Sequence, residues 1–356
     1  MSRSVADLQR LLGVEHAIVQ APMAGVQASA LAIAVCEAGG LGSLPCAMLD
    51  PAALRRELQA LRDGTRQPFN VNFFCHVPPQ PDAAREARWR ERLAPYFAEF
   101  GIDAASLPAG PGRRPFDADG AELLAEFAPP VVSFHFGLPE PALLARVKAW
   151  GATVLASATT VAEARWLAAH GADAIIAQGI EAGGHRGIFL GDDLSTQVGT
   201  IALVPQIAAA VDLPVIAAGG IADADGVAAA CRLGAAGAQI GTAYLLCPEA
   251  TTSPLHRAAL KSDAAVHTAL TNLFTGRPAR GIVNRVIREL GPISEAAPEF
   301  PLATTAISAL RSAAEKRGSS DFSPLWAGQN VSGCKEVSAA QLTRELAAGL
   351  RPAAAG

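Results

Sequence analysis

The chain has 356 residues, half of them hydrophobic and 17% charged, so it can bury a large core as one large domain or two medium ones. A net charge of −4 and a pI near 6 leave no basic surface of the kind that binds nucleic acid or anionic membranes. No run of 18 apolar residues with membrane flanks occurs, and the start of the chain lacks the apolar core of a signal peptide. We therefore expect a soluble, cytoplasmic protein with no nucleic-acid or membrane partner.

The six cysteines are scattered through the chain, at positions 36, 46, 75, 231, 247 and 334. No two of them form a CxxC pair, and none joins histidines at metal-ligand spacing. In a reducing compartment such cysteines usually pack as small hydrophobic side chains. The sequence therefore predicts no metal site.

Short apolar runs alternate along most of the chain with longer stretches of helical period. The short runs are continuously hydrophobic, which is typical of strands buried on both faces in a parallel sheet. We predict eight strands, at residues 17–23, 41–46, 69–75, 131–137, 153–159, 174–180, 214–221 and 237–243. Several of the intervening helical stretches end in glycine, which suits the left-handed residue that follows many helices.

Eight strands separated by helices favour an α/β fold, a (β/α)8 TIM barrel, over an open doubly wound sheet. The open sheet stays an alternative, although the GxGxxG motif that usually follows its first strand is missing. Residues 76–116 are proline-rich at both ends around a charged amphipathic helix and predict an insertion after strand 3. Residues 246–356 predict a C-terminal, mostly helical cap over the substrate region. The barrel itself would comprise residues 1–75 and 117–245.

The candidate site lies at the C-terminal ends of the strands, where barrels of this kind place their catalytic groups. Strands 7 and 8 end in Gly219-Gly220 and in Gly241-Thr242, each followed by a helical stretch. Glycine lets backbone N–H groups converge on an anion, and a helix N-terminus favours negative charge. These two turns therefore predict a phosphate site, the alternative being that the glycines only make tight turns.

Residues at other strand ends suit a flat heterocycle. Pro22 and Met23 offer apolar surface, while Asn72 and Gln178 are amides in buried strands and need hydrogen-bond partners. Met23 can equally be core packing, and each amide can serve a structural carbonyl group. Together these residues fit a ring with several donors and acceptors, such as a flavin.

Two histidines are candidates for the chemistry. His135 lies between two phenylalanines at the end of strand 4, where burial and a bound anion can tune its pKa, although a histidine in a strand can also be a satisfied core residue. In the glycine-rich segment 179–187, Gly183 and Gly184 supply consecutive backbone donors. His185 follows them and either contacts a cofactor or substrate or caps its own loop.

Eight motifs occur in order along the chain: QAPMAG, NVNFF, SFHFGLP, ASATTVAEA, EAGGHRG, VIAAGGI, QIGTA and TGRPARG. Together they resemble the class I nitronate monooxygenases, formerly called 2-nitropropane dioxygenases, over about residues 18–281 and on to LWAGQ at 325–329. The resemblance implies an FMN flavoprotein that oxidises alkyl nitronates with O2 to a carbonyl compound and nitrite. Detoxification of nitronates such as propionate 3-nitronate is the implied task, with a homodimer as one option for assembly.

The resemblance also implies roles for individual residues. His135 matches the histidine that the family places beside the flavin, where it would contact the nitronate or act as a base toward a neutral nitroalkane, and His185 is the second candidate catalytic residue from its position in the glycine-rich segment. The expected FMN contacts are Ala21, Pro22, Met23, Asn72, Gln178, Gly183, Gly184, Gly219, Gly220, Gln239, Ile240, Gly241 and Thr242. One departure concerns the substrate: some relatives place tyrosines and a lysine after the ARG motif, where this chain has Phe300 and no lysine before Lys316.

Two other functions compete with this hypothesis. An NAD(P)H-dependent flavin reductase, acting on a quinone or an enoyl thioester, would use the same barrel and a similar GGH loop. A flavin-free phosphosugar isomerase or aldolase would need a lysine or carboxylate at a strand end, and Glu181 is the one candidate.

Overall fold

The structure is a computed structural model and describes residues 4–104, 107 and 113–350. Eight parallel strands form one sheet in the order β1-β9-β8-β6-β5-β4-β3-β2. A parallel bridge between Val19 and Leu41 joins the two edge strands, so the sheet closes into the predicted (β/α)8 barrel and the open sheet is excluded. The strands are β1 (Ile18–Gln20), β2 (Gly42–Pro45), β3 (Phe69–Phe74), β4 (Val131–His135), β5 (Thr153–Ala158), β6 (Ala174–Gln178), β8 (Val215–Ala218) and β9 (Gly237–Ile240).

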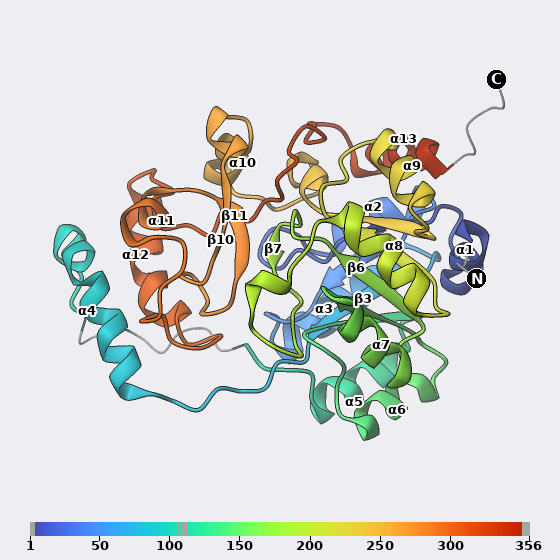
Figure 1. The fold of residues 1–356 in the computed structure, drawn as a ribbon, viewed down its shortest axis with the longest axis horizontal. Coiled ribbons are helices and arrows are strands. Elements are labelled where there is room, and N and C mark those ends of the chain that lie inside the picture. The colour runs from blue at the N-terminus through green and yellow to red at the C-terminus, as the bar shows by residue number, and fades with distance from the viewer. Residues whose placement is uncertain (1–3, 105–106, 108–112, 351–356) are drawn as a thin grey trace.

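Helices surround the barrel (Figure 1). In α3 (Pro51–Gly64), Leu54, Leu58 and Leu61 recur at helical spacing and bury one face of the helix against the strands. Burying each leucine stabilises the fold by about 1.5–3 kcal/mol. The other helices of this layer are α2 (Ser29–Glu37), α5 (Ala118–Phe127), α6 (Pro141–Ala149), α7 (Val161–Ala169), α8 (Thr200–Ala210) and α9 (Ala224–Arg232).

The N-terminal helix α1 (Val5–Leu12) packs against residues of the barrel interior. Leu8 and Leu12 share a buried cluster with Leu155 and Ile216, which lie on β5 and β8. The strands leave the cluster with their C-terminal ends pointing away from α1. Apolar packing therefore fills one end of the barrel and leaves the other available for a site.

The segment after β3 packs against the C-terminal region. Its helix α4 (Ala83–Phe100) lies beside α12 (Thr304–Lys316), away from the barrel (Figure 1). Trp89 and Phe97 of α4 share a buried cluster with Ile287 of α11 (Arg285–Leu290) and Leu310 of α12. The predicted insertion and part of the predicted cap therefore form one joint lobe.

A three-stranded antiparallel sheet connects this lobe to the barrel. It consists of β10 (Thr268–Thr271), β11 (Ala279–Ile282) and β7 (Gly184–His185), with β11 in the middle. In the register, Ala279 faces His185 and Arg280 faces Gly184. The glycine-rich segment after β6 is thus held by strand pairing to a part of the chain almost a hundred residues further on.

The last helix, α13 (Ala339–Ala347), belongs to the range predicted as the cap but packs against the barrel helices. Leu342 and Leu346 share a buried cluster with Leu31 of α2 and Val227 of α9. The predicted domain boundaries stay a prediction. Helix α10 (Pro254–Leu260) lies in the remaining part of the C-terminal region.

Neither a membrane span nor a metal cluster is found among the residues that the structure describes. No helix there combines the length and the hydrophobicity needed to cross a bilayer. The same part of the chain holds no group of three or more histidine, cysteine, aspartate or glutamate side chains arranged to hold a metal ion. The six cysteines are free thiols, three of them buried.

Candidate active site

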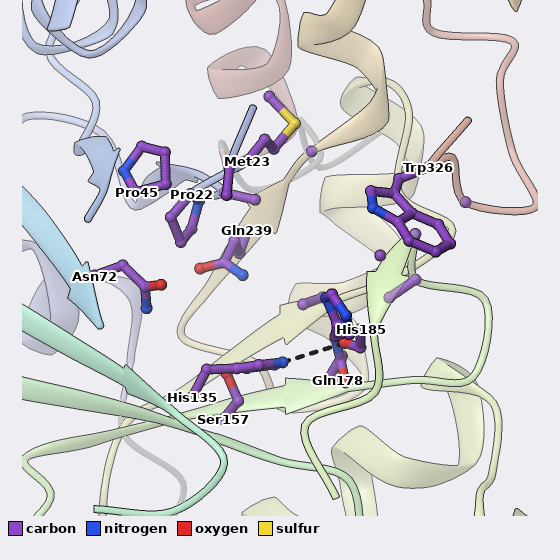
Figure 2. A pocket seen from close by; sticks show the side chains of 18 of the residues that line it. Pro22, Met23, Pro45, Asn72, His135, Ser157, Gln178, His185, Gln239 and Trp326 are labelled. Carbon is purple, nitrogen blue, oxygen red and sulfur yellow. Dashed lines mark hydrogen bonds between the residues drawn. The ribbon is translucent and has the colours of Figure 1, made fainter. Parts of the chain in front are cut away.

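A pocket occupies the C-terminal end of the barrel and is closed on one side by the C-terminal region, with Trp326 and Asn330 in its wall (Figure 2). It gathers all the predicted site residues except Ile240. The predicted residues that line it are Ala21, Pro22, Met23, Asn72, His135, Gln178, Gly183, Gly184, His185, Gly219, Gly220, Gln239, Gly241 and Thr242. Their roles toward a ligand stay predictions, but their proximity is a feature of the fold.

Ile240 is the exception, because its side chain does not line the pocket. Its side chain is 1% exposed and packs with Ile18 and Leu31 between the strands and the outer helices. Successive strand residues point to opposite faces, so Gln239 faces the pocket and Ile240 faces away from it. The backbone carbonyl of Ile240 accepts a hydrogen bond from the Ala21 N–H at 2.8 Å, which is a contact of the barrel wall.

One side of the pocket consists of the turns after β8 and β9. We call Gly219, Gly220, Gly241 and Thr242 the glycine side. Gly219 and Gly220 adopt φ values of 118° and 73°, which side-chain-bearing residues rarely adopt. Within the described chain, no residue accepts a hydrogen bond from the backbone N–H of Gly220, Gly241 or Thr242. These donors line a cavity and are available to an anion.

The two helices that follow these turns differ. Asp223 caps α9, and its carboxylate accepts a hydrogen bond from the Gly226 N–H at 2.8 Å, so one N–H of the helix N-terminus is satisfied within the protein. The short 3-10 helix Thr242–Leu246 follows Gly241 directly and has no side-chain cap. The contribution of the α9 N-terminus to an anion site stays a prediction, and the glycine turns offer the donors that no described residue uses.

Two amides offer acceptor oxygens to the pocket. Asn72 Nδ2 donates to Ser133 Oγ at 2.9 Å and to the Ser133 carbonyl at 3.2 Å, and no described residue donates to Asn72 Oδ1. Gln239 Oε1 is buried without a hydrogen-bond partner. A buried acceptor left unpaired costs about 1–3 kcal/mol, so Gln239 Oε1 marks a position for a donor of a ligand, and Asn72 Oδ1 is a second acceptor at the pocket. Figure 2 shows both side chains facing the space beneath Pro22 and Met23.

His135 has a defined tautomer. Its Nε2 lies 3.2 Å from the backbone carbonyl of His185, which can only accept, so Nε2 carries the proton and Nδ1 is left as the basic nitrogen. No described residue bonds to Nδ1. Burial, and then the charges of Arg277 and Arg186, lowers the pKa of His135 to about 4. The imidazole is therefore neutral at pH 7.

Gln178 fastens the segment that carries His185. Its Nε2 donates to the His185 carbonyl at 2.9 Å, and its Oε1 accepts from the Gly187 N–H at 2.7 Å. The alternative of a structural role for this amide is therefore realised. One N–H of the amide remains for a ligand, since Gln178 also lines the pocket.

His185 is held by the C-terminal region rather than by its own loop. Thr275 Oγ1 donates to the Arg277 carbonyl at 3.3 Å, so His185 Nε2, 2.9 Å from that hydroxyl, is the donor to it. The ring centroid of Phe300 lies 5.3 Å from that of His185. Burial, followed by nearby cationic groups, holds the pKa of His185 well below its usual range. His135, His185 and Arg113 line what we call the histidine side of the pocket, and Phe300 packs behind the last two of them.

Phe136, next to His135, adopts a left-handed backbone with φ of 70°. For a residue other than glycine this costs about 1–2 kcal/mol. The guanidinium of Arg277 lies 4.0 Å from the centroid of the Phe136 ring, a cation–π contact that holds the ring in place. The strain and the clamp next to His135 fix the end of β4.

The sequence reasoning missed Arg113 and Trp326, which both line the pocket. Arg113 is the one lining residue with a formal charge in the part of the chain that the structure describes. It follows a proline-rich stretch of the predicted insertion, where no local pattern relates it to the strand ends. Trp326 lies in the LWAGQ motif, which the resemblance includes without assigning it a role.

Glu181 does not line the pocket. Its carboxylate accepts hydrogen bonds from the Thr200 N–H at 2.9 and 3.0 Å and from Thr200 Oγ1 at 2.9 Å, and so caps α8. No aspartate, glutamate or lysine occurs among the described lining residues. The isomerase and aldolase hypothesis therefore lacks the group that it needs.

Comparisons with known proteins point to one family. The sequence model of the family described as nitronate monooxygenase matches residues 6–349. A nitronate monooxygenase of Pseudomonas aeruginosa PAO1 is 45% identical, over 96% of this chain and 98% of that protein. One from Paraburkholderia phytofirmans PsJN is also 45% identical, over 94% of this chain and 92% of its own length. The crystal structure of a nitroalkane oxidase from Streptomyces ansochromogenes superimposes with a TM-score of 0.86, at 41% identity, over 96% of this chain and 97% of that one.

Proposed function

The chain belongs to the nitronate monooxygenase family, and from this premise we propose that it is an FMN-dependent enzyme that oxidises alkyl nitronates with O2 to a carbonyl compound and nitrite. It is thus an oxidoreductase. One observation carries the proposal: a single pocket joins free backbone donors, unpaired amide oxygens and a neutral histidine with a free Nδ1. These are the groups that a phosphate, a flavin ring and a carbon acid would each need.

The residues present fit FMN. Gly220, Gly241 and Thr242 would hold its phosphate with their backbone N–H groups, and the oxygen of Asn72 or of Gln239 would accept a hydrogen bond from the ring N–H. The orphaned Gln239 oxygen is the clearest sign of this fit, because it has no partner among the described residues. Bound FMN would supply the acceptance of electrons from the substrate and their transfer to O2.

His135 would serve two kinds of substrate. Toward a neutral nitroalkane, Nδ1 would remove the proton from the carbon next to the nitro group, since Nε2 is already committed to the His185 carbonyl. Toward a nitronate, which has lost that proton, a base is unnecessary. The negative charge of the bound nitronate would raise the pKa of His135, so that a protonated Nδ1 would donate to a nitronate oxygen.

Aromatic side chains would limit the access of water to the reacting atoms. Phe74 and Phe136 pack edge to face with ring centroids 4.9 Å apart, and both are buried beside His135. Polar contacts in such surroundings are stronger than they are in water. We propose that nitronates such as propionate 3-nitronate are detoxified at this site in the cytoplasm, by a homodimer.

The experiment is a visible spectrum of the purified protein followed by a nitrite assay. We expect flavin absorption bands, release of FMN on denaturation, and nitrite from propyl-2-nitronate under air without NAD(P)H. An absence of nitrite with every alkyl nitronate would rule out the proposal. Bleaching of the flavin by NADH without oxygen would instead assign the protein to the flavin reductases that use the same barrel.

A further inference from the structure

Arg113 lines the pocket, and its guanidinium makes few hydrogen bonds to the described residues. Its Nη1 donates to Thr304 Oγ1 at 3.1 Å, and its Nη2 lies 4.0 Å from Met48 Sδ, a weak acceptor. A guanidinium has five N–H donors, and most of those of Arg113 donate to no residue in the part of the chain that the structure describes. None of the carboxylates in the described part of the chain forms an ion pair with Arg113.

Other buried arginines near the pocket are committed to the protein. Arg186 donates to the carbonyls of Gly179 and Gln178, both at 2.7 Å. Arg280 donates to the Ile180 carbonyl at 2.9 Å. These two side chains hold backbone carbonyl groups in place, whereas the guanidinium of Arg113 lines the cavity.

The surroundings of Arg113 place it on the substrate side. Its guanidinium lies 5.5 Å from the ring centroid of Phe300, and that ring contacts His185. The described lining holds no acidic side chain, so an anion that enters the pocket meets no negative charge from it. A second anion, besides the phosphate proposed for the glycine side, would therefore bind at Arg113.

We propose that Arg113 determines specificity by binding a carboxylate carried by the nitronate substrate, an inference that rests on the proposed function. The planar guanidinium matches a carboxylate with two parallel hydrogen bonds, which a rounded ammonium group cannot make. The nitronate end of the same molecule would reach His135. Lys316, at the end of α12, is exposed and does not line the pocket.

The test compares two nitronates with the same three-carbon skeleton, propionate 3-nitronate and propyl-1-nitronate, in air. We expect Arg113→Gln to lower kcat/KM for the carboxylated substrate at least about tenfold, mainly through KM, because the charge-assisted pair is lost. The variant should stay within about threefold of the parent on propyl-1-nitronate. Arg113→Lys should recover part of the lost kcat/KM, because lysine restores the positive charge but cannot make the two parallel hydrogen bonds of the guanidinium.

Arg114→Gln is the matched control. Arg114 is the neighbouring residue, but its side chain is 70% exposed and forms ion pairs with Asp117 and Asp119 outside the pocket. This variant should process both nitronates like the parent. Equal losses of Arg113→Gln on the two substrates, or no loss on either, would overturn the assignment.

A binding experiment separates this inference from the proposed function. Succinate, with a second carboxylate in place of the nitronate, is titrated into the flavin-loaded protein by calorimetry. Arg113→Gln should bind succinate at least about tenfold more weakly, and Arg114→Gln should bind it like the parent. An unchanged affinity in Arg113→Gln would refute carboxylate binding even if the parent released nitrite, and a parent that released no nitrite would refute only the proposed function.

Discussion

The two sides of the pocket are built from different kinds of sequence. The glycine side comes from two consecutive strand–turn units and acts through its backbone. The histidine side acts through side chains that come from β4, the segment after β6, the insertion and the C-terminal region, and the His135–His185 contact alone spans 50 residues. A backbone site can therefore be found in a local motif, whereas a side-chain site depends on how distant segments pack.

The largest effect on activity is expected from a substitution on the histidine side. His135→Asn removes the free Nδ1, so oxidation of a neutral nitroalkane should fall at least about 100-fold in kcat/KM, the usual contribution of a general base. A nitronate needs no base, and its oxidation should fall less than about tenfold. The measurement is kcat/KM for nitroethane and for ethylnitronate.

The control for this prediction is His256→Asn. His256 is also buried, and burial lowers its pKa to about 4, but it does not line the pocket. It should leave the ratio of the two substrates unchanged. Equal losses of His135→Asn on both substrates would contradict the role of His135 as a base.

The second largest effect is the pH dependence of the free energy of unfolding. Only the histidine side contributes to it, because the glycine side has no titratable group. Burial lowers the pKa of His76, like that of His135, to about 4, below the unfolded value of 6.5. Between these values the unfolded chain binds more protons, so the free energy of unfolding falls as the pH falls from 6.5 toward 4. The expected loss by pH 5 is on the order of 2 kcal/mol for each such histidine.

Thermal unfolding at pH 7 and pH 5 measures this dependence. His135→Asn should reduce the difference between the two midpoints, while Gly220→Ala should leave it unchanged. An identical pH response in the parent and in His135→Asn would show that the buried imidazole is not a source of acid sensitivity.

A smaller effect is expected from the glycine side. Gly220→Ala places a side chain on a backbone with φ of 73°, and relief of the strain of about 1–2 kcal/mol should displace this turn and its N–H group, which should weaken FMN binding about tenfold. Gly151→Ala is the matched control, since its φ is 86° and no atom within 4 Å would meet the new methyl group. Both variants should lose similar stability, and only the first should release FMN more readily, as flavin fluorescence would show. Equal FMN affinity in both would refute the phosphate site.

The smallest effect is expected from a substitution that tests which face of β9 lies toward the pocket. Ile240→Val removes one methylene from the barrel wall and should lower the free energy of unfolding by about 1 kcal/mol. FMN affinity should not change, because the side chain faces away from the pocket. Denaturant unfolding and a flavin titration measure the two quantities. Weaker FMN binding without a loss of stability would show that the Ile240 side chain contributes to the FMN site.

Much of the fold could be predicted from the sequence. The eight strands follow from continuous apolar runs, and the strand ends that carry Asn72, His135 and Gly220 follow from the barrel geometry. Ile240 was predicted to face the pocket together with its neighbours in the motif QIGT, whereas alternate strand residues face opposite ways and its side chain packs in the barrel wall.

Other parts of the site left no local signal. The pairing of His185 with Ala279 joins segments far apart in the chain, and the sequence near either residue does not predict it. Arg113 lies in the insertion, and its place in the pocket depends on its contacts with Met48 and Thr304. Such contacts arise from tertiary packing, which periodicity and motifs do not encode.

A crystal structure with FMN and succinate tests the central claim most directly, namely that the two sides of one pocket divide the binding of the coenzyme and the substrate. The account predicts the phosphate against the backbone N–H groups of Gly220, Gly241 and Thr242, the flavin ring next to His135, and a succinate carboxylate on Arg113. A phosphate bound at Arg113, or a flavin ring away from His135, would contradict it.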